Sequence, residues 1–165
     1  MADLVDVDEV KAFFFKAMSQ GYANAKSGMK VPDMPGFKEI KFREGDFELL
    51  DRWGKHPDTP RSFGTTYIWH KGIPVWTMSY GGYYFEEAIP VLRAALRSNY
   101  EVHRFIGCRG PRQFEVDGMK YINAPRLNEF WRFEGREEIF TKEAKNLGYH
   151  EYWGMSLNYP MARRD

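Results

Sequence analysis

The sequence predicts an α+β fold, in which a helix–strand–strand–strand unit occurs twice and forms antiparallel sheets related by pseudo-twofold symmetry. Similar segments at similar spacings indicate the duplication. Three pairs of segments correspond: Val75–Tyr80 with Tyr152–Leu157, the helical pattern from Asp8 with the one from Glu86, and Gly64–Lys71 with Gly135–Lys142. Chance similarity is the alternative interpretation, and the agreement of three separate pairs argues against it.

Two segments have the apolar spacing of an amphipathic helix. Acidic pairs open both, at Asp8–Glu9 and Glu86–Glu87, where the helix dipole favours negative charge. Pro90 falls in a first turn, which tolerates proline. Apolar residues then recur every three or four positions: Val10, Phe13, Phe14 and Ala17 in the first segment, and Ile89, Leu92, Ala95 and Leu96 in the second.

Alternation of apolar and polar residues predicts the strands, and Lys71–Gly72 marks a hairpin. The expected strand regions are Glu39–Trp53, Thr65–Tyr80, Arg112–Asn123, Leu127–Gly135 and Gly148–Tyr159. Each helix would cover one small antiparallel sheet. A single domain, residues 1–165, would then contain two halves, about residues 6–84 and 85–159, with a cleft where the two sheets meet.

Composition and charge exclude several classes of function. The 165 residues carry a formal net charge of +1, so no global field attracts nucleic acid or an anionic membrane. No apolar run is long enough to span a bilayer, and the first residues are acidic where a signal peptide is basic. The sequence therefore predicts a cytoplasmic protein with no membrane or nucleic-acid partner, and a homodimer is an open alternative.

Aromatic residues make up 17% of the chain, and many lie on the predicted strands. Such rings either form the core or line a cleft that suits a flat or cationic ligand. The candidate ligand-binding residues from this group are Trp69, Trp76, Tyr80, Trp131 and Trp153. Both interpretations stay open at this point.

Glu137 is the most informative charged residue. Strict alternation puts it on one face of a strand with Phe133 and Ile139, and a carboxylate on an apolar face is costly unless it is paired. Perturbed carboxylates of this kind cluster at functional sites. We therefore count Glu137 among the candidate ligand-binding residues, with a charge at the edge of a strand as the alternative.

The other chemical candidates are weaker. Arg109 and Arg112 flank Gly110–Pro111 and either bind an anion or simply form a turn. Cys108 beside Arg109 is either a nucleophile of lowered pKa or an inert thiol. The four histidines have no metal-ligand spacing, and no glycine-rich phosphate loop is present. We expect no metal ion and no cofactor, and we assign no catalytic residue.

Several segments resemble the bacterial domain of unknown function DUF5680: "FREGDFELLD", "WHKGIPVWTMSYGG", "RGPRQFEVDGMKY", "FWRFEGREEIF" and "YWGMSLN". The resemblance spans residues 8–158. It implies no established activity, and in that family the domain stands alone or follows an XRE-type helix-turn-helix. It also implies one acidic residue in each half, with Glu137 in the second and Thr66 at the matching position of the first. The duplicated unit is similar, as a circular permutation, to GyrI-like effector-binding domains, which bind amphipathic drugs beside a glutamate.

These observations favour a domain that binds a small aromatic or cationic molecule between its two halves. A hydrolase that uses Glu137 or Cys108 in the same cleft is the first alternative. A protein–protein interaction module that uses exposed aromatic side chains is the second.

Overall fold

A computed structural model describes residues 4–24 and 27–159 of the chain. The helices are α1 (Val7–Ser19), η1 (Tyr22–Asn24), η2 (Glu86–Ala88) and α2 (Ile89–Tyr100). The strands are β1 (Met29–Lys30), β2 (Phe37–Glu44), β3 (Phe47–Lys55), β4 (Arg61–His70), β5 (Ile73–Tyr84), β6 (Gln113–Val116), β7 (Met119–Glu129), β8 (Arg132–Phe140) and β9 (Asn146–Ser156). The fold is therefore mixed α+β, as the sequence predicts.

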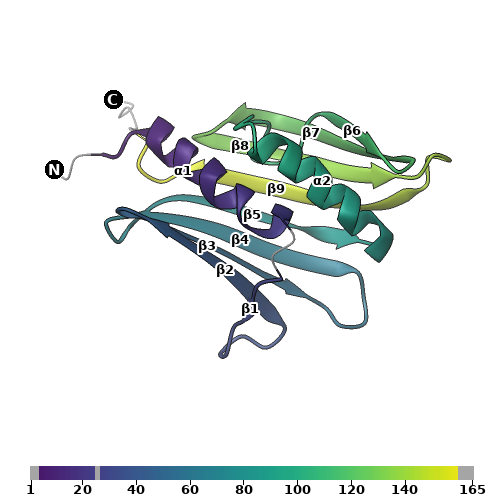
Figure 1. Cartoon of the computed structure of the whole chain (residues 1–165), viewed down its shortest axis with the longest axis horizontal. Helices are drawn as coiled ribbons and strands as arrows, with labels where there is room; N and C mark the ends of the chain where they lie inside the picture. The colour runs from purple at the N-terminus through teal and green to yellow at the C-terminus, as the bar shows by residue number, and fades with distance from the viewer. Residues whose placement is uncertain (1–3, 25–26, 160–165) are drawn as a thin grey trace, which may run out of the picture.

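All the described strands join one antiparallel sheet, in the order β1-β2-β3-β4-β5-β9-β8-β7-β6. The predicted small sheets are thus continuous, because β5 pairs with β9 from Trp76–Ser156 to Tyr84–Gly148. Each helix precedes a run of strands in the chain, and the two runs meet at this central pair. Figure 1 shows the strands that follow α1 on one side of the β5–β9 pair and those that follow α2 on the other.

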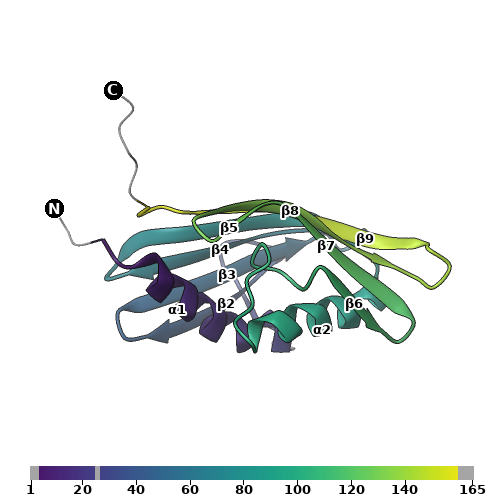
Figure 2. The same cartoon turned by 90° about the horizontal axis from the view of Figure 1, so that it is seen from above.

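Both α-helices lie on the same face of the sheet, as Figure 2 shows from above. Asp6 caps α1 by accepting a hydrogen bond from the backbone N–H of Asp8, and Pro90 lies in the first turn of α2. Each helix turns its apolar side toward the sheet, where α1 buries a run of three phenylalanines, residues 13–15. None of the described helices has the length and apolar character that crossing a bilayer requires.

Large rings fill the space between the helices and the sheet. The indole of Trp76 packs on Phe14, with ring centroids 5.0 Å apart, and stacks on Phe130 and Phe133 at 5.4 Å and 5.6 Å. Its Nε1 donates to the carbonyl of Phe130 at 3.3 Å. Trp76 is fully buried, so the structure places this predicted ligand-binding residue in the core.

The two Trp-x-Met-Ser-like stretches lie in different surroundings. Trp76 points to the helix-bearing face, whereas Trp153 is 38% exposed on the opposite face. The two runs of strands correspond more closely at a glycine–tyrosine pair. Gly64 pairs with Tyr80 across β4 and β5, and Gly135 pairs with Tyr152 across β8 and β9. In both pairs the tyrosine ring occupies the space that a Cβ atom at the glycine position would need, so only glycine fits there.

Candidate functional site

A cavity of about 110 Å³ lies between the helix-bearing face of the sheet and the helices α1, η1 and α2. Strands β3, β4, β5 and β9 form its floor. Its wall is mostly aromatic and aliphatic, with the rings of Tyr22, Trp53, Tyr80, Tyr84 and Tyr100. The polar lining side chains include Asp51, Ser62, Arg109 and His150, and the exposed Lys55 marks the side nearest to solvent.

Asp51 gives the cavity a carboxylate. It alternates with Leu49 and Trp53 along β3, so it points to the helix-bearing face, and it is only 4% exposed. Its Oδ1 accepts hydrogen bonds from Thr66 Oγ1 at 3.0 Å and from the Tyr80 hydroxyl at 2.9 Å. Its Oδ2 has no hydrogen-bond donor among the described residues. Burial raises the pKa of Asp51, although these two hydrogen bonds and the charge of Arg109 oppose the rise.

Arg109 and Glu137 form a buried ion pair beside the cavity. The Nε and Nη2 atoms of Arg109 both donate to Oε1 of Glu137, at 3.1 Å and 2.5 Å. The other carboxylate oxygen of Glu137 accepts from the Tyr121 hydroxyl at 2.5 Å. Burial disfavours the charge of Arg109, but Glu137 outweighs this effect, so the pKa of Arg109 is raised well above its usual value. The guanidinium therefore stays a cation.

The loop between α2 and β6 fixes the position of Arg109. The Asn99 side chain donates to the carbonyl of Arg109 at 2.9 Å, and the Asn123 side chain donates to the carbonyls of Ile106 and Gly110. The preceding Cys108 has a positive φ of 56°. These bonds satisfy the buried backbone of the loop and hold the guanidinium over the Tyr80 ring, 5.1 Å from its centroid.

His150 and Ser62 form a second polar pair on the cavity wall. The hydroxyl oxygen of Ser62 lies 3.0 Å from Nε2 of His150, and the imidazole Nδ1 lies 3.7 Å from Oε1 of Glu137. Burial and the nearby cation of Arg109 lower the pKa of His150 to about 3. The order serine–histidine–carboxylate is that of a nucleophile triad. However, Glu137 already neutralises Arg109, so an imidazolium at His150 has little stabilisation, and His150 is a poor base.

The structure brings two of the sequence-predicted site residues to the cavity and separates the others. Tyr80 and Arg109 line it, and Glu137 lies behind Arg109 as its counter-charge. As the alternation predicts, Glu137 shares its face of β8 with the buried Phe133 and Ile139.

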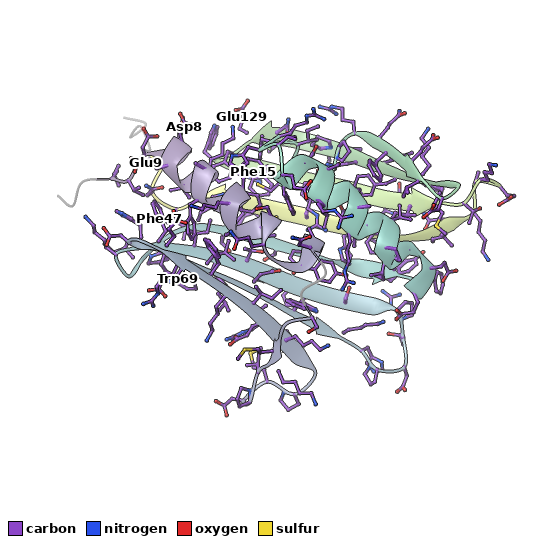
Figure 3. The ribbon with its side chains drawn as sticks, viewed as in Figure 1. Asp8, Glu9, Phe15, Phe47, Trp69 and Glu129 are labelled. Atoms are coloured by element: carbon purple, nitrogen blue, oxygen red, sulfur yellow. The ribbon has the colours of Figure 1, made fainter. Side chains whose placement is uncertain are left out.

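The remaining predicted residues lie elsewhere. Trp69 sits near the β4–β5 hairpin, away from α2, as Figure 3 shows. Trp131, in the turn between β7 and β8, stacks on Tyr159 near the end of the described chain. Arg112 is exposed, whereas Arg109 is buried. Cys108 is fully buried, and burial raises the pKa of its thiol well above the usual value, which disfavours a nucleophilic role.

Sequence reasoning missed Asp51, Ser62 and His150. The signal for Asp51 was present, because Phe47, Leu49, Asp51 and Trp53 alternate just as Phe133, Glu137 and Ile139 do. Asp51 is also the register partner of Thr66, so the first run of strands does carry a buried carboxylate, one strand away from the position that the family resemblance implied. Ser62 and His150 are far apart in the sequence and come together only when the sheet forms, so no local sequence pattern identifies them.

A family model described as "Domain of unknown function (DUF5680)" matches residues 56–155, which is more than half of the chain. No curated protein matches the sequence, and no solved structure matches it. The matched segment includes Tyr80, Arg109, Glu137 and His150, whereas Asp51 precedes it.

Proposed function

The chain belongs to the DUF5680 family of domains of unknown function, and we propose that its cavity binds a small aromatic cation. The observation that carries this proposal is the Oδ2 atom of Asp51. It belongs to a carboxylate that is only 4% exposed and lines an aromatic cavity, and no described residue donates a hydrogen bond to it. A ligand that donates to this oxygen from within the cavity forms a charge-assisted hydrogen bond.

The balance of charges around the cavity favours a cation. Arg109 is neutralised by Glu137, and Lys55 is paired with Glu86 at the surface. His150 is neutral because its pKa is lowered to about 3. In its ionised form, Asp51 is then the one lining charge, among the described residues, without a counter-ion. Aromatic faces around a cation add a further attraction.

The size of the cavity limits the ligand to about one ring. Pockets for drug-sized compounds have volumes of about 300–1,000 Å³. The volume of about 110 Å³ found between sheet and helices is nearer to the roughly 150 Å³ of an engineered cavity that accepts benzene. Benzylamine, one ring with one ammonium group, is therefore a suitable probe.

Replacing Asp51 with asparagine should weaken benzylamine binding at least about tenfold, because a charge-assisted hydrogen bond becomes a neutral one. Benzyl alcohol, which has the same shape without the charge, should bind the two proteins alike. Trp53 lines the cavity, so its fluorescence reports binding, and calorimetry supplies the affinity.

Asp46→Asn is the matched control, because Asp46 lies in the exposed turn between β2 and β3 and its carboxylate forms a salt bridge of 3.7 Å with Lys71. Equal benzylamine affinity in the wild type and in Asp51→Asn would refute the assignment of the cation to Asp51. The absence of any binding to a folded wild-type protein would refute the proposed function.

Benzylamine affinity should rise with pH through the pKa of Asp51 and then level off. Burial raises that pKa above the ordinary value of 3.8, so over part of the acidic range Asp51 is protonated in the empty cavity. The cation must then displace a proton, which costs affinity. Calorimetry between about pH 4 and pH 8, in buffers of different ionisation enthalpy, should show proton release at the acidic end and none on the plateau. Affinity independent of pH would contradict this linkage.

We further propose that residues 6–84 and 85–159 are copies of one unit. The matching Gly64–Tyr80 and Gly135–Tyr152 pairs support this, since a tyrosine lies over a glycine in both. The hydroxyls of Tyr80 and Tyr152 also donate to similar acceptors, Asp51 and Asn123. The cavity takes lining residues from both halves, with Asp51 and Tyr80 from the first and Arg109 and His150 from the second.

A further inference from the structure

We propose that the ligand also carries a neutral hydrogen-bond acceptor, which the Nη1 edge of Arg109 binds while Asp51 binds the ammonium group. The ligand class is then a single-ring heteroaromatic amine, with a ring nitrogen or a carbonyl oxygen as acceptor. This inference rests on the proposed function and adds a second, independent anchor to it.

The donors of Arg109 are only partly used. A guanidinium has five N–H groups on three nitrogens. Two of the nitrogens, Nε and Nη2, donate to the same oxygen of Glu137. Nη1 makes no hydrogen bond to the described residues. Arg109 is 3% exposed and lines the cavity, so a ligand in the cavity can reach its guanidinium.

Both oxygens of Glu137 already accept hydrogen bonds from other donors. Its Oε1 accepts both bonds from Arg109, and its Oε2 accepts from Tyr121. A hydrogen bond from a charged donor is stronger than one from a neutral donor, so an acceptor on the ligand gains from filling that position.

Tyr80 places the two anchors close together. Its hydroxyl donates to Asp51, and its ring lies under the guanidinium of Arg109. One planar ring in the cavity can therefore present an ammonium group to Asp51 and an acceptor to Arg109. Both anchors are held rigidly, Asp51 by its hydrogen bonds on the sheet and Arg109 by its ion pair.

The balance of charges in the cavity favours a neutral acceptor on the ligand. Glu137 already balances Arg109, and the ammonium group of the ligand balances Asp51. A carboxylate on the ligand would add an unbalanced negative charge in a buried site, whereas a ring nitrogen or carbonyl oxygen adds none.

The three picolylamine isomers test this inference against benzylamine. Each has the size and ammonium group of benzylamine, and one ring C–H is replaced by a nitrogen acceptor. At neutral pH, at least one isomer should bind the wild-type protein about tenfold tighter than benzylamine, since a hydrogen bond to a charged donor is worth about that factor. The double variant Arg109→Met/Glu137→Gln should lose this preference, so that the isomers and benzylamine bind it with similar affinity. Arg112→Met, at an exposed position, should leave the preference unchanged.

The possible failures are distinguishable. If benzylamine binds through Asp51 but no isomer exceeds it, the role of Arg109 is refuted and the proposed function stands. If no amine binds, both are refuted. A preference that persists in the double variant also refutes the role of Arg109. Should that variant fail to fold, the ranking of the four amines on the wild-type protein decides by itself.

Discussion

Glu137→Gln alone is expected to lower the free energy of unfolding by about 3–5 kcal/mol, because it leaves the guanidinium of Arg109 buried without a counter-charge. Both side chains are almost completely enclosed, with relative exposures of 4% and 0%. For a protein of this size the loss corresponds to a decrease in melting temperature of roughly 6–20 °C. Arg109→Met should have a similar effect, since it leaves the carboxylate uncompensated.

The double variant Arg109→Met/Glu137→Gln should be more stable than either single variant. Removing both charges also removes the cost of burying them, and the glutamine still accepts from Tyr121. Thermal and urea unfolding of the four proteins give the coupling energy between the two side chains. If the double variant loses as much stability as the sum of the single variants, the pair is not coupled as the distances indicate.

A neighbouring pair on the same strand provides the control. Arg136 and Glu138 lie 3.0 Å apart on the opposite face of β8, and about a third of each side chain is exposed. Exposed ion pairs typically contribute about 0–1 kcal/mol. Glu138→Gln should therefore change the stability little, although it makes the same chemical change one position away from Glu137.

Local sequence patterns account for the elements and for part of the site. The period-two alternation around Glu137 correctly predicted a buried carboxylate. The acidic pair Asp8–Glu9 lies in the first turn of α1 as predicted, whereas Glu86–Glu87 lies in η2, just before α2 begins at Ile89. The same alternation in β3 contains Asp51, which is also buried. Burial depends on which face of a strand is covered by the helices. Charge and spacing in the sequence therefore do not tell which carboxylates are buried.

Contacts between distant segments account for what the sequence did not show. The guanidinium of Arg109 reaches Glu137 from a loop 28 positions earlier, and Ser62 meets His150 across 88 positions. The interpretation of Arg109 as half of an anion site with Arg112 used sequence proximity, whereas the folded chain pairs it with a carboxylate. Trp76 and Trp153 illustrate the same difficulty. Alternation assigns the side chains of a strand to two faces, but it does not show which face the helices cover.

Trp76→Ala is expected to lower the free energy of unfolding by about 3–5 kcal/mol, the range for removing a fully buried large ring. The indole is 0% exposed and stacks between Phe14, Phe130 and Phe133. Its removal leaves a void in a close-packed core and frees the Phe130 carbonyl that accepts from Nε1. The benzylamine affinity of the folded fraction should stay unchanged, because Trp76 does not line the cavity.

Trp153→Ala makes the same chemical change on the opposite face of the sheet and should cost much less. Trp153 is 38% exposed, and Arg132 lies over its ring at 5.5 Å, an interaction worth roughly 0.5–1 kcal/mol at an exposed site. Urea unfolding of both variants, with calorimetric titration of benzylamine, separates the role of each ring in the core from a role in binding. Equal losses of stability would show that the sheet does not divide the two indoles as described. A loss of affinity in Trp76→Ala at full stability would move the binding site from the cavity beside Asp51 into the ring cluster around Phe130.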